Sequence, residues 1–140
     1  MRNSYANIMQ SKYFTLAFNS AIFDGPIRIY FAQFHEAFAL KVYFEIQQRF
    51  KEDLQLIKSA SKKTHSNMMV MIYPDREQYE YGFSSDKTVG LEIWNQDIVL
   101  GIEKPMDESE IEKLVDLFQI AIFKWKEINE KKQLPSQIGL

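Results

Sequence analysis

A run of six apolar residues at positions 68–73, MMVMIY, restricts the fold more than any other stretch of the sequence. A Ser-Asn pair precedes the run and a Pro-Asp pair follows it, so residues typical of turns bound it on both sides. Because neither its odd nor its even positions are polar, we interpret the run as a strand that is buried on both faces. Such a strand is expected at the centre of a sheet.

Two hairpins are predicted on either side of this run. Residues 13–23 and 27–32 alternate between apolar and other side chains, and Asp-Gly-Pro lies between them. Glycine supplies backbone freedom, proline fixes φ, and the carboxylate of Asp24 can cap its own turn, so we predict a hairpin rather than a ligand-binding loop. Residues 89–94 and 98–103 flank Asn-Gln-Asp and form the second predicted hairpin.

Two other segments are harder to assign. Residues 34–47 alternate as a strand does, but the longer segment 34–63 also gathers apolar residues on one side of a helix, namely Ala39, Tyr43, Ile46, Phe50, Leu54 and Ile57. No turn-forming residue interrupts the segment before Asp53, so we predict one long helix and keep the strand as the alternative. Residues 76–83 carry aromatic side chains at alternate positions, which indicates a further strand or a strand-like edge.

The last element is the clearest helix in the sequence. Pro105 ends the preceding strand, Asp107 is a suitable N-cap, and Glu110 completes a pattern similar to a capping box. The residues that follow form one apolar side, which consists of Ile111, Leu114, Val115, Phe118, Ile122 and Trp125. We predict that this helix ends near Lys131 and that Pro135 prevents its continuation.

Together these elements predict an α+β fold. We expect a two-layer sandwich in which a mainly antiparallel sheet of about five strands is packed by two long helices, in the order ββα-βββ-α. Neither a repeat nor a linker divides the chain, so residues 1–140 are interpreted as a single domain, with an N-terminal arm over 1–12 and a C-terminal tail over 132–140. With 46% apolar residues, a chain of this length can form one core.

The sequence offers little for catalysis or for cofactor binding. It contains no cysteine, which excludes disulfides, thiolate metal sites and cysteine nucleophiles. The histidines, His35 and His65, lack a second ligand at helical spacing, which argues against a metal site. The five glycines form no phosphate-binding loop and no nucleophile elbow. We therefore predict that the protein is not an enzyme and that it binds neither a cofactor nor a metal ion.

The net charge of −2 conceals an asymmetry between the two halves of the chain. Residues 1–70 contain nine Lys or Arg and five Asp or Glu, a net charge of +4, whereas residues 71–140 contain eight and fourteen, a net charge of −6. We expect the halves to neutralise each other, with a self-associating surface as the alternative. The acidic pI of about 5.7 argues against nucleic acid, and no apolar run approaches the ~20 residues of a membrane span, so we expect a cytoplasmic protein.

Four apolar residues lie outside the predicted buried sides of the two long helices. Ile120 and Phe123 fall among acidic residues on the last helix, and Leu40 and Phe44 lie away from the apolar side of the helix over 34–63. Such residues favour contacts with another protein, either in a homo-oligomer or as an adaptor or assembly subunit. The alternative for the first pair is that two apolar residues of the C-terminal tail cover it.

A second function is also compatible with the sequence. The chain is rich in aromatic residues, and a pocket between the sheet and a helix could bind a small molecule. The residues expected to line such a pocket are Tyr30, Tyr43, Tyr73 and Trp94. A small-molecule sensor is therefore the alternative to a protein-binding domain.

Overall fold

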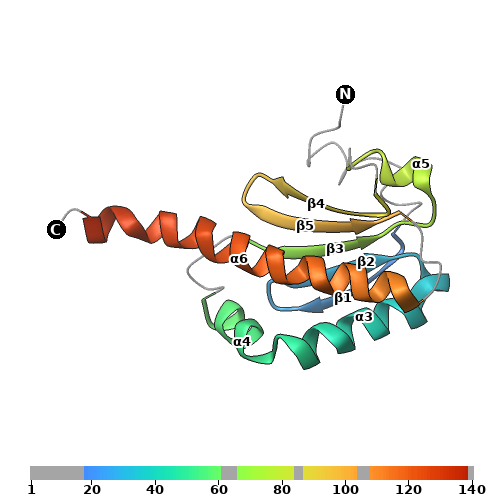
Figure 1. Ribbon diagram of the computed structural model, residues 1–140, viewed down its shortest axis with the longest axis horizontal. Helices are drawn as coiled ribbons and strands as arrows, with labels where there is room; N and C mark the ends of the chain where they lie inside the picture. Colours follow the sequence, from blue (N-terminus) through green and yellow to red (C-terminus); the bar gives the residue numbers. More distant parts are fainter. Residues whose placement is uncertain (1–17, 61–65, 84–86, 104–107, 139–140) are drawn as a thin grey trace.

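The computed structural model describes residues 18–60, 66–83, 87–103 and 108–138, with only the backbone described at 108 and 130–138 (Figure 1). Its strands are β1 (Ser20–Asp24), β2 (Ile27–Phe31), β3 (Met68–Ile72), β4 (Val89–Trp94) and β5 (Asp97–Ile102). Its helices are the short 3-10 helix η1 (Gln33–His35), α3 (Glu36–Arg49), α4 (Lys51–Ala60), α5 (Arg76–Tyr79) and α6 (Glu108–Ile138). The predicted arm over 1–12, the first residues of the first predicted strand and Asp107 lie outside the described residues.

The strands form one sheet with the order β1-β2-β3-β5-β4, so the predicted α+β class with five strands is confirmed for the described residues. The apolar run at β3 occupies the centre of the sheet, as its pattern predicts. The sheet is mixed, because β1–β2 and β4–β5 are antiparallel whereas β3 is parallel to both β2 and β5. Antiparallel pairing therefore holds for the two hairpins and not for the centre. Parallel pairing of β2 and β3 requires a connection that returns the chain to the end of the sheet at which β2 begins, and the helical segment between these strands is long enough for that.

The two predicted hairpins are present, and each turn has the residue that its backbone requires. Gly25 has a φ of 63° and Asn95 a φ of 59°, the left-handed region that glycine and asparagine tolerate best. The carboxylate of Asp24 does not cap its turn as predicted. It accepts hydrogen bonds from Lys58 Nζ at 2.6 Å and Tyr43 Oη at 2.7 Å, which tie the turn to helices α3 and α4.

The ambiguous segment after β2 is helical, as predicted, but it forms two helices rather than one. Phe50 separates α3 from α4 with a φ of −120° and a ψ of 33°, outside the helical region. Its ring packs against that of Phe118, with the ring centres 5.6 Å apart. The bend at Phe50 keeps both helices close to the sheet and to α6, and the predicted end of the helix near Lys63 lies outside the described residues.

The prediction of a strand over residues 76–83 is wrong, because this segment begins with the short helix α5. Asp75 caps the helix, since its carboxylate accepts a hydrogen bond from the backbone N–H of Gln78 at 2.9 Å. Tyr79 and Phe83 then stack, with ring centres 5.0 Å apart. Their spacing of four residues reflects a helical turn and not the alternation of a strand.

Helix α6 is longer than predicted, because it continues through Pro135 to Ile138. Proline removes one backbone donor, but its fixed φ is compatible with a helix, so it need not end one. The residues predicted to form a tail from position 132 onward are therefore helical as far as 138. In Figure 1 the C-terminal part of α6 extends beyond the sheet.

Both faces of the sheet are buried, by different means. The three long helices cover one face, where alternate strand residues such as Ile29, Val70 and Leu100 meet Val42, Ile57 and Phe118 of the helices. On the other face, the intervening strand residues Met69, Met71 and Val99 are covered mainly by aromatic side chains. The predicted two-layer sandwich thus describes the sheet and the long helices, and the second face carries an additional aromatic cluster.

Candidate functional site

The four apolar residues predicted to lie outside the core are all exposed. The exposed fractions are 50% for Leu40, 57% for Phe44, 49% for Ile120 and 62% for Phe123. Leu40 and Phe44 are one turn apart on α3, on the side opposite to the buried Val42. The exposure that the helical spacing predicts is therefore present, while the predicted role of these residues in an interface stays a prediction.

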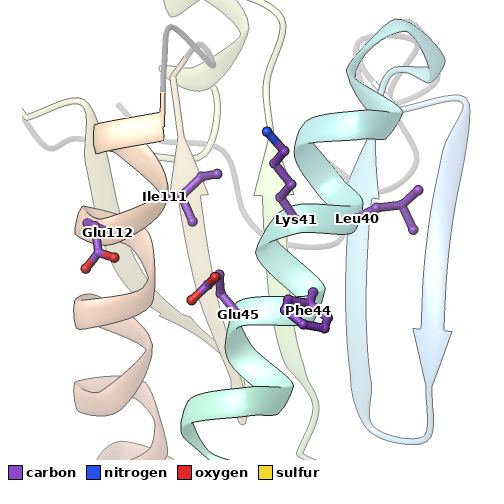
Figure 2. Close-up of a pocket in the computed structure, with 6 residues that line it drawn as sticks. All are labelled: Leu40, Lys41, Phe44, Glu45, Ile111 and Glu112. Atoms are coloured by element: carbon purple, nitrogen blue, oxygen red, sulfur yellow. The ribbon is translucent and has the colours of Figure 1, made fainter.

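Leu40 and Phe44 border an open groove of about 530 Å³ between α3 and α6 (Figure 2). The other lining residues are Lys41 and Glu45 from α3 and Ile111 and Glu112 from α6. Figure 2 shows Glu45 and Ile111 directed toward the space between the helices, whereas Leu40 points away from α6. The groove therefore has a partly apolar lining flanked by charged side chains.

Ion pairs hold the helices on either side of this groove together. Arg49 of α3 donates hydrogen bonds to Glu112 at 2.6 Å and to Asp116 at 3.2 Å, and Lys126 of α6 bonds to Asp53 of α4 at 2.8 Å. The hydrogen bond with Glu112 is the main cause that raises the pKa of Arg49 above its usual value. These side chains are between 32% and 72% exposed, so each pair adds little stability, but the pairs link α6 to both α3 and α4.

Ile120 and Phe123 lie three residues apart on the exposed side of α6. Ile120 borders a second groove, of about 810 Å³, between α6 and the edge strand β4, and Phe123 does not line it. The sequence therefore identified two exposed apolar residues correctly.

The C-terminal residues do not fold back over Ile120 and Phe123. Because α6 continues to Ile138, Leu134 lies roughly 20 Å farther along the helix axis than Ile120, at ~1.5 Å per residue. The alternative in which a tail covers this pair is therefore wrong.

Of the four residues predicted to line an aromatic pocket, three lie in one packed cluster and the fourth lies on the other side of the sheet. Tyr30, Tyr73 and Trp94 are 7%, 2% and 5% exposed and belong to the aromatic cluster on the second face of the sheet. Tyr73 packs edge-on against Phe18 at 4.9 Å between ring centres, and burial raises its pKa. These rings fill the face as core residues do, and the grooves described above are lined by other residues.

Tyr43 lies on the opposite side of the sheet from the other three aromatic residues. It belongs to α3, donates its hydroxyl proton to Asp24 and accepts a hydrogen bond from Gln47 Nε2 at 2.8 Å. Burial, together with the bond to Asp24, raises the pKa of Tyr43 to about 12. Tyr43 therefore connects a helix to a turn and does not line a pocket shared with Trp94.

The described residues contain no group of three or more histidine, aspartate or glutamate side chains that could hold a metal ion. His35 ends η1, where its ring lies 4.3 Å from that of Phe34, and His65 lies outside the described residues. Among the described helices, none combines the length and the apolar character that crossing a membrane requires.

Sequence reasoning missed four exposed apolar residues of the described part of the chain, namely Phe23, Phe34, Leu56 and Ile93. Ile93 of β4 is 46% exposed, although it alternates with Glu92 and Trp94 as a core-facing residue should. Its exposure follows from the position of β4 at the edge of the sheet, and the sequence pattern carries no signal for strand order.

No protein-family model, no curated protein and no solved structure matches this chain.

Proposed function

We propose that this domain is not an enzyme and that it functions by binding another protein through the outer side of its helices. The observation that carries the proposal is that Leu40 and Phe44, on the outer side of α3, are each exposed by half or more. A helix that only covers a sheet has polar residues on this side. Two large apolar residues one turn apart form the kind of small patch that favours a partner.

The surroundings of this pair also support a protein contact. The neighbouring groove is lined by the charged residues Lys41, Glu45 and Glu112 and by the buried Ile111, so polar side chains flank the exposed pair. Since each side chain of the pair is already about half-buried, completing its burial would contribute roughly 0.8–1.5 kcal/mol, about half the value for a fully exposed side chain.

The positions of the four aromatic residues do not favour the alternative of a small-molecule sensor, which requires them to line one pocket. Of the aromatic residues expected to line a pocket, Tyr43 lies on the helical side of the sheet, and Tyr30, Tyr73 and Trp94 are packed in a cluster on the other side. We therefore retain the protein-binding function as the single proposal.

Site-specific photo-crosslinking tests this function. A photoreactive phenylalanine analogue replaces Phe44 in the otherwise unchanged chain, which is expressed and irradiated in cells. We expect a discrete crosslinked product that is lost in the additional variant Leu40→Asp. The matched control is Gln48→Asp, which places the same charge at an exposed position one turn farther along α3 and should leave the product in place. Equal products in both variants, or none in the parent, would contradict the proposal, provided that circular dichroism shows all chains to be folded.

A further inference from the structure

Strand β4 forms one edge of the sheet, and no strand of the described part of the chain pairs with its outer side. The backbone N–H of Glu103 donates to the carbonyl of Thr88 at 2.9 Å, which fixes the hydrogen-bonding alternation along the β4–β5 ladder. In an antiparallel ladder every second residue turns its backbone groups toward the neighbouring strand. Gly90 and Glu92 therefore face β5, and the intervening residues direct their N–H and C=O groups outward.

The outward-facing residues are Val89, Leu91 and Ile93, whose side chains point to the helical face of the sheet. Val89 and Leu91 are half-buried and line the groove beside α6, together with Leu117 and Ile120. Ile93 is 46% exposed. Within the described ranges, the edge thus offers backbone groups that no strand pairs and a row of apolar side chains on the same three residues.

This edge has few of the features that usually prevent strands from pairing. Strand β4 has six residues, VGLEIW, with no proline and only one charged residue, Glu92. Monomeric proteins commonly protect an edge strand with lysine, proline, a bulge or a short length. An apolar edge without these features is a template for another strand.

We propose that β4 pairs with β4 of a second copy of this chain, antiparallel about a two-fold axis at Leu91, so that two sheets become one continuous sheet. Leu91 then faces Leu91 of the other copy, and Val89 faces its Ile93. An identical apolar row meets itself, as a two-fold interface requires. The second strand lies beside the groove bordered by Ile120, which accounts for the exposure of that residue.

Charge selects this register. Residues whose backbone groups point outward must pair with such residues of the other copy. Only two-fold axes at Leu91 and at Glu92 meet this condition and also pair five residues of each β4 strand. An axis at Glu92 places the two Glu92 carboxylates directly opposite each other, which is destabilising. An axis at Leu91 places each Glu92 opposite Gly90 of the other copy, so the two carboxylates are diagonal neighbours and not directly opposed.

This pairing goes beyond the proposed function and uses a different surface. Leu40 and Phe44 lie on α3, away from β4, and remain exposed in such a dimer. A failure of the dimer would leave the photo-crosslinking result at Phe44 unchanged, and the reverse also holds.

The chain contains no cysteine, so introduced cysteines report the register directly. Across the proposed axis the Cα atoms of two copies of Leu91 lie about 5.5 Å apart, within the range of a disulfide. Two copies of Glu92 lie diagonally, at about 7–8 Å, and link poorly. Sedimentation of the parent chain over a wide concentration range measures its mass, and mild oxidation of Leu91→Cys and Glu92→Cys measures the linkage.

We expect the parent to sediment at twice its monomer mass of 16.6 kDa, with efficient crosslinking of Leu91→Cys and little of Glu92→Cys. Ile93→Lys, which alters an exposed side chain, should weaken the dimer at least tenfold without unfolding the chain. If Leu91→Cys fails to fold, an equimolar mixture of Val89→Cys and Ile93→Cys tests the same register, since only the mixed pair should link. A monomeric parent, or preferential linkage through Glu92→Cys, would overturn the proposal.

Discussion

Replacement of Gly101 by alanine should destabilise the protein, because no space exists for even one methyl group at this position. Gly101 lies on β5, between Met71 of β3 and Gly90 of β4. An added Cβ atom would lie 2.4 Å from Cε2 and 2.6 Å from Cζ of Phe83, whereas ordinary contacts begin at 3.4 Å. The phenylalanine ring would therefore have to move by about 1 Å.

The ring of Phe83 has little freedom to move. Phe83 is 1% exposed, and its ring centre lies 5.0 Å from that of Tyr79 and 5.6 Å from that of Trp94. Overpacking of a core costs typically about 1–3 kcal/mol, and the short contacts place this change near the upper end. Because alanine reduces the conformational entropy of the unfolded chain, the substitution also stabilises the folded state by roughly 0.4–1 kcal/mol. The net loss is about 2 kcal/mol, or a decrease of about 7 °C in Tm for a domain of this size.

Denaturant unfolding of four chains tests this reasoning. The chains are the parent, Gly101→Ala, Phe83→Leu and the double variant. Phe83→Leu alone should cost about 1–2 kcal/mol, since it removes part of a packed ring. In the Phe83→Leu background the alanine no longer contacts a phenylalanine ring, so the loss of unfolding free energy caused by Gly101→Ala should be smaller by at least about 1 kcal/mol. Additive effects of the two substitutions would show that the contact with Phe83 is not the cause.

Two further predictions concern the polar contacts that join the elements. Asp24→Asn should cost about 1 kcal/mol near pH 7, because it removes the charge that pairs with Lys58. Although burial acts to raise the pKa of Asp24, hydrogen bonds from Lys58 and Tyr43 lower it overall, so this stability is present above the unfolded pKa of about 4 and is lost as the pH falls through the folded pKa. Unfolding titrations at about pH 7 and about pH 3 should therefore show a difference between parent and variant that shrinks with acid, and a constant difference would contradict the assignment. Arg76→Ala should remove the hydrogen bond to Glu103 at 2.8 Å and accelerate amide hydrogen exchange over residues 76–83 several-fold, whereas unchanged exchange there would show that this bond does not hold α5 in place.

Local features of the fold were predictable from the sequence because local chemistry determines them. The left-handed backbone at Gly25 and Asn95 marks both hairpin turns. The apolar run at β3 is buried on both faces, and the absence of turn residues before Asp53 correctly favoured a helix over a strand. Each of these signals lies within a few residues of the structure that it predicts.

Two features were not predicted, one because a local signal was misinterpreted and one because it depends on distant contacts. The strand over 76–83 was predicted from alternating aromatic residues, but Asp75 caps a helix there and Tyr79 stacks on Phe83. A Pro-Asp pair after a strand was available as a helix-start signal, and it was interpreted only as the end of β3. The parallel pairing of β3, in contrast, depends on where the connections cross the sheet, which no short pattern encodes.

The candidate sites illustrate the same limit. An apolar residue on the polar side of a helix can be recognised from spacing alone, so the exposure of Leu40 and Phe44 was predictable. The aromatic residues were assigned to a pocket because the sequence shows that rings are abundant and not which face of the sheet they cover. The helices cover one face, so Tyr73 and Trp94 are needed to cover the other.

The exposure of Ile93 has a different origin from that of the helical residues. Its alternation in β4 is that of a buried position, and the same alternation buries Leu100 completely on the neighbouring strand. Ile93 is exposed because β4 is the edge strand among the described residues and the covering helix α6 lies over β5 more than over this edge. A core-like alternation at an edge strand is what the proposed pairing requires. In that pairing a second β4 strand places Val89 opposite Ile93 without placing the two Glu92 carboxylates directly opposite each other.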